Sequence, residues 1–225
     1  MFGAMSINPW VNQVIRPFIA LAPVMSLSHI SAPLRALARL PLIPDLLGRL
    51  EAPFLPSSRF LTQVERTFCH PPLRPLCLSL LGILGGFDDF MLNKTRLPVY
   101  ETGFPAGSSN KNLALYSQHI RSGRFADYDY GTVGNLRRYG QVTPPEFVIE
   151  RITNQHICLI SGNNDFLAPP KDVDVLRSRL KVKLHADLTV PYARWSHFDF
   201  AIGLQADAFV TRPVLKLLSE FDPHV

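Results

Sequence analysis

The sequence predicts an α/β protein in which a large helical region is inserted between the strands of a parallel β-sheet. From about residue 151 onward, strand, turn, helix, strand, loop and helix patterns follow one another, and such alternation is typical of parallel sheets. A short continuous apolar run at 18–22, ended by Pro23, suits a strand that is covered on both faces. Between these two parts, a Leu- and Pro-rich stretch shows helical and irregular patterns in place of strands.

These observations divide the chain into three parts. Residues 1–25 give a polar segment followed by the first core strand, and residues 26–150 form the helical region. Residues 151–225 supply the remaining strands and helices of the core. No internal repeat or low-complexity tract interrupts this order.

The clearest helix of the middle region lies within residues 108–123. Ser108 or Ser109 can cap its first turn, and Gly123 is a typical stop. Apolar residues recur inside it at spacings of three and four, as on one face of a helix, at Leu113, Tyr116 and Ile120.

The last part alternates strands and helices. Residues 156–160 and 186–192 are predicted strands, and a helix between them opens at Pro169 and Pro170 and runs to about Leu180. A final helix is expected from Phe198 or Asp199 to about Phe221. The residues expected to face inward are Val173, Val175 and Leu176 in the first helix and Ile202, Phe209, Val214, Leu215 and Leu218 in the second.

The charge distribution excludes some classes of partner. The net charge is +5, but the basic residues are scattered as singles and pairs, so no nucleic-acid partner is expected. No apolar stretch reaches the roughly 18 to 20 residues needed to cross a bilayer. Arg16 and the apolar residues 17–25 loosely imitate a signal peptide, but the segment before them is long and mixed, so no convincing signal peptide is present.

Two residues are candidates for catalysis, and each lies in the loop that follows a predicted strand. Asp165 lies in "SGNNDFLAPPKDV" (161–173) and His197 in "RWSHFDF" (194–200). Functional loops of open α/β sheets lie at the carboxyl ends of strands, and an aspartate there can orient a histidine that acts as a general base. Alternatively, Asp165 caps the following helix or closes an Asx turn, and His197 is an ordinary loop residue.

Several motifs together resemble the acid lipases, the gastric and lysosomal lipases of the α/β-hydrolase fold. They are "FIALAPV", "PAGSSNKNLALYSQHIRSGRFADYDYG", "YGQVTPPEF", "SGNNDFLAPPKDVDVL" and "SHFDFAIG". The resemblance implies that Asp165 and His197 match the family's catalytic aspartate and histidine. It also implies that residues 26–150 form a cap and lid over an apolar acyl pocket, and that residues 1–25 begin with the end of the helix that follows the nucleophile elbow.

The nucleophilic serine expected of such an enzyme has no counterpart in the sequence. No G-x-S-x-G motif occurs, and the nearest imitation, "AGSSN" at 106–110, lacks the second glycine. We therefore expect an incomplete α/β-hydrolase fold, the C-terminal portion of a lipase whose elbow and oxyanion hole lie upstream of Met1. Without them the chain alone is expected to be inactive.

The cysteines and one sequon fit the same resemblance. The family carries a disulfide close to the positions of Cys69 and Cys77, although two unrelated free thiols remain the alternative. Cys158 lies in a predicted core strand and is interpreted as a small buried apolar residue. Asn93 begins the sequon Asn93-Lys94-Thr95, which is an N-glycosylation site by resemblance and a chance match otherwise.

Three functional hypotheses remain open. The first is a serine ester hydrolase of neutral lipids, such as triacylglycerols or sterol esters, that needs no cofactor or metal, contacts the lipid interface through the cap and is lysosomal or secreted. The second is a non-catalytic remnant of a lipase that binds lipid or a partner. The third is another α/β hydrolase that uses Asp165 and His197 with a different nucleophile.

Overall fold

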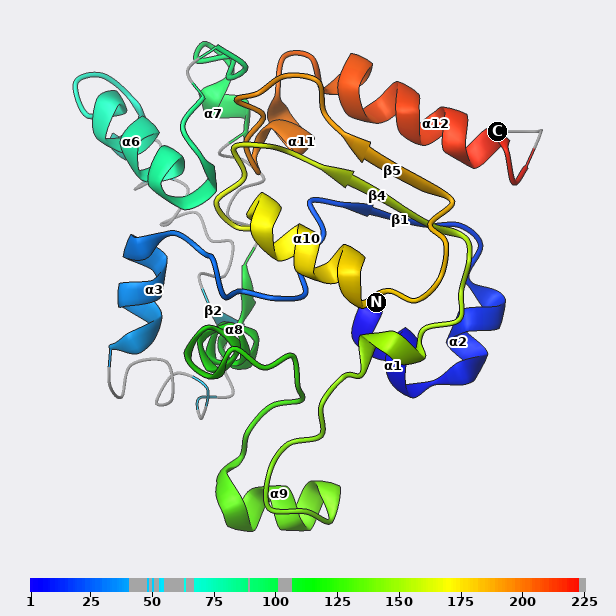
Figure 1. Ribbon diagram of the computed structural model, residues 1–225. Helices are drawn as coiled ribbons and strands as arrows, with labels where there is room; N and C mark the ends of the chain where they lie inside the picture. The colour runs from blue at the N-terminus through cyan, green and yellow to red at the C-terminus, as the bar shows by residue number, and fades with distance from the viewer. Residues whose placement is uncertain are drawn as a thin grey trace.

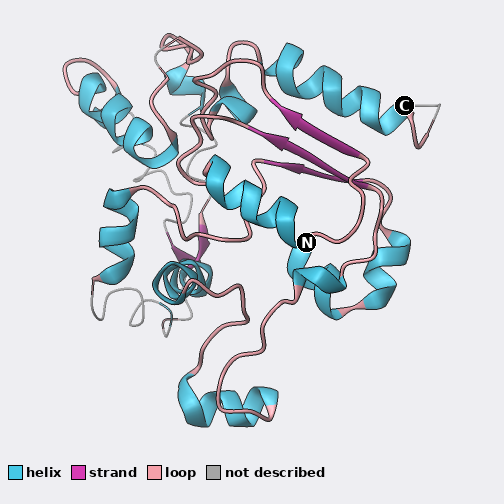
Figure 2. Cartoon of the chain, viewed as in Figure 1, coloured by secondary structure: helices cyan, strands magenta, loops and turns pink. Residues whose placement is uncertain are grey.

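The computed structural model describes residues 1–40, 48, 50, 53–54, 63, 67–88, 90–100 and 107–222 (Figure 1). Parts of the predicted 26–150 region and the first residue of the "AGSSN" segment lie outside the described residues. Within the described ranges, helices and loops surround one small parallel sheet (Figure 2).

That sheet contains three parallel strands in the order β1-β4-β5. They are β1 (Phe18–Leu21), β4 (Ile157–Ser161) and β5 (Ala186–Thr189), with Ile19 opposite Cys158 and Leu159 opposite Asp187. The predicted α/β class is therefore confirmed. The strand predicted at 186–192 is too long, because Pro191 has no N–H to continue the ladder beyond Val190.

Both faces of the central strand β4 are buried. Ile157 and Leu159 point into a cluster with Phe2, Met5, Leu176 and Leu180, whereas Cys158 and Ile160 point to the opposite face. There they meet a second cluster that contains Trp195, Val210 and Leu217. This alternation explains why β4 is apolar at successive positions, as strands covered on both sides are.

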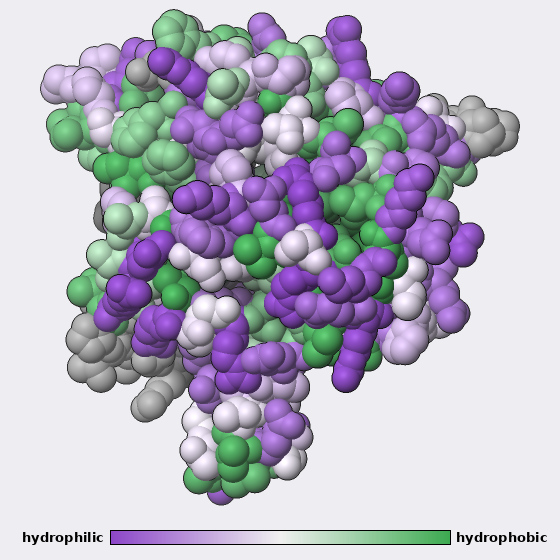
Figure 3. Space-filling model, viewed as in Figure 1, coloured by the Kyte–Doolittle hydropathy of each residue, from purple (hydrophilic) through white to green (hydrophobic). Residues whose placement is uncertain are grey.

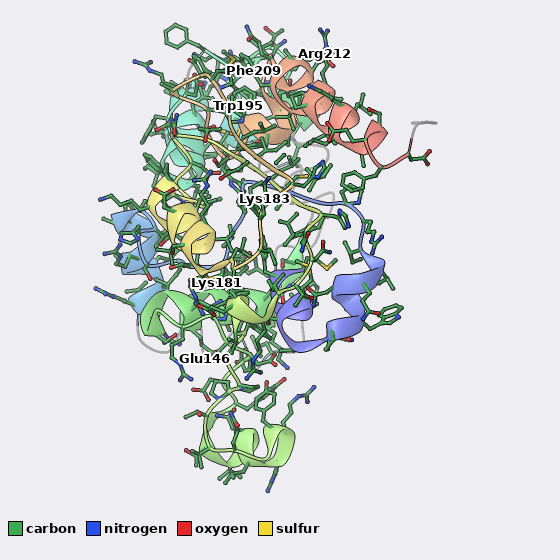
Figure 4. All side chains as sticks on the ribbon, turned by 45° about the vertical axis from the view of Figure 1, so that its right-hand side comes forward. Glu146, Lys181, Lys183, Trp195, Phe209 and Arg212 are labelled. Carbon is green, nitrogen blue, oxygen red and sulfur yellow. A yellow bond between two sulfur atoms is a disulfide. The ribbon has the colours of Figure 1, made fainter. Side chains whose placement is uncertain are left out.

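Helices from distant parts of the sequence supply these two layers. α1 (Phe2–Ile7) and α10 (Pro170–Arg179) lie on one side of the sheet, and α12 (Arg212–Ser219) lies on the other (Figure 1). Trp195 and Phe209 pack edge to face, with ring centroids 5.5 Å apart, in the α12 layer (Figure 4). Cys158 is fully buried there, as expected of a small apolar residue.

The N-terminal segment contains two short helices. α1 ends at Asn8, whose side chain accepts a hydrogen bond from Trp10 N and so caps α2 (Pro9–Val14). Asn12 then ties the segment to the core: its side-chain oxygen accepts from Thr153 N at 3.1 Å and Asn154 N at 3.2 Å. This contact fixes the chain directly ahead of β4.

The described part of 26–150 is mostly helical. It contains α3 (Ala32–Arg39), α6 (Arg74–Gly85), α7 (Leu97–Tyr100), α8 (Asn110–Ser122), α9 (Gly131–Tyr139), the 3-10 turn η1 (Ile149–Arg151) and the short antiparallel pair β2 (Pro53–Phe54) and β3 (Ser108–Ser109). α6 and α7 lie beyond the carboxyl ends of the strands, while α9 projects away from the rest of the chain (Figure 1).

α8 has the predicted boundaries but a different buried face. Ser109 Oγ accepts from Asn112 N at 3.1 Å, and Gly123 ends the helix in the left-handed conformation. Tyr116, however, is 50% exposed, whereas Ala114 is fully buried and Ser117 nearly so. Small side chains face α3 because they allow close approach, and Ser117 Oγ donates to Ala38 O.

The single C-terminal helix predicted to begin at 198 or 199 is wrong. The chain instead forms α11 (Asp199–Ile202), a π-helical turn η2 (Asp207–Thr211) and then α12. The first break occurs where Gly203 pairs with Leu92 and Leu204 N donates to Met91 O at 2.7 Å. Leu215, expected inside, is 50% exposed, and Val210 and Leu217 are buried instead.

Candidate active site

Asp165 lies in the loop that follows β4, and its side chain is fully buried. One carboxylate oxygen, Oδ1, accepts hydrogen bonds from Leu167 N at 2.9 Å and Ala168 N at 2.6 Å. The other, Oδ2, lies 2.9 Å from Nδ1 of His197. Asp165 therefore closes an Asx turn and contacts the histidine at the same time, so these two interpretations of the sequence are compatible.

His197 lies in the loop that follows β5, the neighbour of β4 in the sheet. Its side chain is 30% exposed, and its backbone N–H donates to Gly85 O at 2.9 Å. A carboxylate accepts hydrogen bonds, so Nδ1 carries the proton that points to Asp165. Nε2 then keeps its lone pair free to take a proton, which is the arrangement of a general base.

The two loops are joined directly to each other. Asn164 N donates to Trp195 O at 3.1 Å, and the Asn164 side-chain amide donates to Arg194 O at 3.1 Å. Gly162 permits this approach, because a Cβ atom there would lie 2.6 Å from Trp195 O. The pairing of Asp165 with His197 thus depends on several backbone contacts between neighbouring loops.

A second aspartate, Asp199, is hydrogen-bonded to the backbone of the loop that carries His197. Asp199 is 3% exposed, and its Oδ2 accepts from Ser196 N at 2.7 Å. Burial raises the pKa of Asp199, and the nearby carboxylates of Asp88 and Asp165 add to the rise, while the bonds from Ser196 lower it. Asp199 lies within the "HFDF" motif, so the motif itself was the signal that could have identified it.

Other contacts were not found from the sequence. Asn164 stands next to Asp165 in a turn, and nothing in the spacing reveals that it bridges two loops. Gly85 and Gly86 form a glycine pair at the end of an apolar helix, which signals a close approach but not its partner.

The remaining predicted residues lie elsewhere. Cys69 and Cys77 form a disulfide at the start of α6, with a Cα–Cα distance of 5.1 Å. Asn93 is partly exposed, and its side-chain oxygen accepts from Thr95 N and Arg96 N in a turn. Neither feature touches the Asp165–His197 pair.

No group of three His, Cys, Asp or Glu side chains that could hold a metal occurs in the described residues. A cavity of about 1170 Å³ lies beside α8 and is lined in part by Lys111, His119 and Tyr128. It includes neither Asp165 nor His197. We therefore do not assign it to the chemistry of the pair.

Comparison with known proteins identifies relatives over almost the whole chain. The lysosomal acid lipase/cholesteryl ester hydrolase of Macaca fascicularis is 34% identical over 224 residues, which cover 98% of this chain and 55% of that protein. The gastric triacylglycerol lipase of Rattus norvegicus is 32% identical, over 97% of this chain and 55% of that protein. Lipase lipl-5 of Caenorhabditis elegans is 33% identical, over 92% and 52%.

Two other comparisons add little. No protein-family model matches the chain. Among solved structures, an alpha/beta hydrolase fold protein from Nakamurella multipartita matches with a TM-score of 0.42 and 12% identity, over 96% of this chain and 64% of that one. This structural similarity is too low to support an argument.

The sequence matches therefore decide the family. They extend along nearly all of this chain, and the aligned relatives are all named as lipases. The chain spans about half the length of the curated relatives it matches. On these matches, the chain belongs to the acid lipase family.

Proposed function

We propose that residues 1–225 supply the aspartate and histidine of a serine ester hydrolase that acts on neutral lipid esters, such as triacylglycerols or sterol esters. The observation that carries the proposal is the contact between Asp165 Oδ2 and His197 Nδ1 at the carboxyl ends of adjacent parallel strands. The names of the relatives, a triacylglycerol lipase and a cholesteryl ester hydrolase, support this substrate class.

In the proposed reaction, His197 Nε2 takes the proton of a serine hydroxyl as that oxygen attacks the ester carbonyl. His197 then returns the proton to the leaving alcohol. Asp165 fixes the tautomer of the ring and stabilises the imidazolium while it exists. A water molecule, activated by the same nitrogen, releases the fatty acid in the second half of the reaction.

The serine is the missing partner. Among the described residues, the His197 ring is hydrogen-bonded to Asp165 through Nδ1. The sequence contains no G-x-S-x-G motif. We propose that the nucleophile and the oxyanion hole come from outside residues 1–225. The chain by itself should then lack esterase activity.

The region 26–150 is proposed to form the cap. α6 and α7 lie beyond the carboxyl ends of the strands, on the side of the site (Figure 1). α6 and the residues at its two ends also expose an apolar stripe at spacings of three and four, formed by Leu73, Leu76, Leu80, Ile83 and Phe87. Figure 3 shows hydrophobic residues, in green, at the upper left of the surface, where Figure 1 places α6. Such an exposed stripe supports contact with a lipid–water interface through the cap.

A lysosomal or secreted location is proposed as well. The Cys69–Cys77 disulfide is a bond that oxidising compartments favour, and Asn93 offers a site for N-glycosylation. The relatives are named lysosomal and gastric lipases, which agrees with such a location. No helix in the described part of the chain combines the length and apolarity that a bilayer crossing demands.

A chimera tests the proposed reaction. Residues 1–225 replace the aligned segment of the Macaca fascicularis lipase, and hydrolysis of a fluorogenic fatty-acid ester is measured. We expect a folded, active chimera and a loss of at least about 10⁴-fold in kcat for its His197→Ala variant. A folded but inactive chimera, or an active His197→Ala variant, would contradict the proposal.

The isolated chain provides the matching experiment. Residues 1–225 should not react with a fluorophosphonate probe, whereas the chimera should. Stoichiometric labelling of the isolated chain would show that it contains its own nucleophile and would favour a different α/β hydrolase. If the chimera has no activity but the isolated chain binds lipid tightly, a non-catalytic remnant would be favoured.

A further inference from the structure

The C-terminal end of α6 contacts both loops of the candidate site. The carbonyl oxygen of Gly85 accepts one hydrogen bond from His197 N at 2.9 Å and another from Phe166 N at 3.3 Å. Phe166 is the residue directly after Asp165. A single backbone oxygen therefore binds the residue that carries the imidazole and the neighbour of the residue that carries the carboxylate.

A side chain at either glycine would clash at this contact. A Cβ atom on Gly85 would lie 2.5 Å from the ring of Phe198, and one on Gly86 would lie 1.9 Å from the carbonyl oxygen of Asn164. Gly86 also has a φ of +111°, a conformation that side chains disfavour. The two glycines therefore let the backbone of 85–87 approach both loops without these clashes.

Asn164 closes the contact from the other side. Its side-chain amide donates to Phe87 O at 2.9 Å as well as to Arg194 O at 3.1 Å. The rings of Phe87 and Phe166 meet edge to face, with centroids 6.2 Å apart. Residues 85–87 are thus held between the Asp165 loop and the His197 loop by bonds to both.

The geometry points to Gly85 and Gly86 as positioning residues that set the distance and orientation of His197 relative to Asp165. This inference rests on the proposed function for its catalytic meaning, but the contact itself is independent of any nucleophile. The two loops are also joined to each other through Asn164, and a misplacement of about 1 Å in a catalytic constellation can cost about 100-fold in rate. The glycine pair therefore couples α6, in the proposed cap, to the proposed base.

The imidazole can report this coupling directly. In the 225-residue chain labelled with ¹⁵N-histidine, the proton on His197 Nδ1 should give a far-downfield NMR signal, because it donates to a buried carboxylate. We expect Gly85→Ala and Gly86→Ala to remove or shift that signal at temperatures where the far-UV circular dichroism remains native. A purely structural role would lower the melting temperature and leave the signal of the folded protein unchanged.

Gly140→Ala is the matched control. Gly140 also has a positive φ, +71°, but no atom lies within 4 Å of a Cβ placed there. This variant carries the backbone strain without the clash, so it should keep the His197 signal. Loss of the signal in Gly140→Ala as well would overturn the inference, since strain at any glycine would then suffice.

A rescue experiment separates the two glycines. The clash at Gly85 involves the Phe198 ring, so Gly85→Ala combined with Phe198→Ala should recover the signal seen in Phe198→Ala alone. The clash at Gly86 involves a backbone oxygen, so Phe198→Ala should not rescue Gly86→Ala. Rescue of both variants, or of neither, would contradict the assigned contacts.

Two further results keep the inference separate from the proposed function. If the glycine variants fail to fold, amide hydrogen exchange in the unmodified chain decides. Slow exchange of the Phe166 and His197 amides supports the contact, and fast exchange of both overturns it.

In the active chimera, Gly86→Ala should lower kcat by about 100-fold with little change in KM. An unchanged NMR signal in folded variants refutes the positioning role even if the chimera is active, and an inactive chimera with the expected signals refutes only the lipase reaction.

Discussion

At the residue scale, Asp165 uses its two carboxylate oxygens for different purposes. Oδ1 accepts from two backbone N–H groups and shapes its own turn, while Oδ2 faces the imidazole. Because a neutral amide has one acceptor and one donor end, an asparagine here cannot serve both partners in the same way.

Asp165→Asn should therefore abolish activity without unfolding the protein. The amide oxygen would stay with Leu167 N and Ala168 N, which places the NH₂ group against His197 Nδ1. The imidazole must then accept at Nδ1 and carry its proton on Nε2, the tautomer that cannot act as a base. We expect kcat of the chimera to fall by about 10⁴-fold. Asp174→Asn, at an exposed residue of α10, is the control and should change kcat less than about twofold; a modest effect of Asp165→Asn would contradict the assigned role.

Asp199 gives a prediction for pH dependence. Burial raises the pKa of Asp199 in the folded state above its ordinary value of 3.8, so the folded protein binds this proton more tightly than the unfolded chain. The stabilisation is full below 3.8 and is lost as the pH rises through the folded-state pKa. In the Asp199→Asn variant the side-chain amide does not titrate, but its oxygen can still accept from Ser196 N.

The unfolding free energy of the wild type, relative to Asp199→Asn, should therefore be larger near pH 4 than at pH 7. Urea melts of both proteins at several pH values measure this difference. Asp174→Asn, at a side chain that is 68% exposed, is measured in the same melts as the control. If the unfolding free energy of the wild type, relative to Asp199→Asn, increased as the pH rises, the pKa of Asp199 would be lowered by folding and not raised.

At the element scale, predictions succeeded where local signals suffice. β4 is predictable because a strand buried on both faces is continuously apolar, and β1 shows the same apolar run although only Ala20 of its four residues is buried. The ends of α8 were found because Ser109 and Gly123 act within one turn of the backbone. The C-terminal helix was predicted as one piece because its break depends on Leu92, which is distant in sequence.

The buried face of α8 supplies a stability prediction. Ala114→Leu adds three heavy atoms at a fully buried position, close to the backbone of Gly48, and should cost about 1–3 kcal/mol of unfolding free energy. Tyr116→Leu, on the exposed face, should change that free energy by less than about 0.5 kcal/mol. Urea melts measure both changes in unfolding free energy. A larger loss for Tyr116→Leu than for Ala114→Leu would support the buried face predicted from the apolar spacing instead.

At the scale of the whole molecule, the site forms only because distant parts of the chain meet. Asp165 and His197 could be paired from the sequence, since both follow strands and parallel strands end at one edge. The participation of Gly85 could not, because it joins α6 to loops that follow it by about 80 and 110 residues. The glycine pair signals a close approach of the backbone, but the sequence does not reveal its partner.

The exposed apolar surface of α6 gives the last prediction. Leu76, Leu80 and Phe90 are 58%, 47% and 68% exposed and lie on or shortly after this helix. If this surface enters a lipid interface, serine at all three positions removes about 1 kcal/mol of favourable transfer each, which weakens binding to phospholipid-coated triacylglycerol droplets by roughly 100-fold. Co-flotation of the 225-residue chain with such droplets on centrifugation measures the loss. The matched control replaces Val133, Leu136 and Leu215, which are 62%, 48% and 50% exposed on α9 and α12. Because that surface lies away from the carboxyl ends of the strands, the control should bind normally, and equal loss in both triple variants would show that apolar exposure alone, not the position of α6, determines binding.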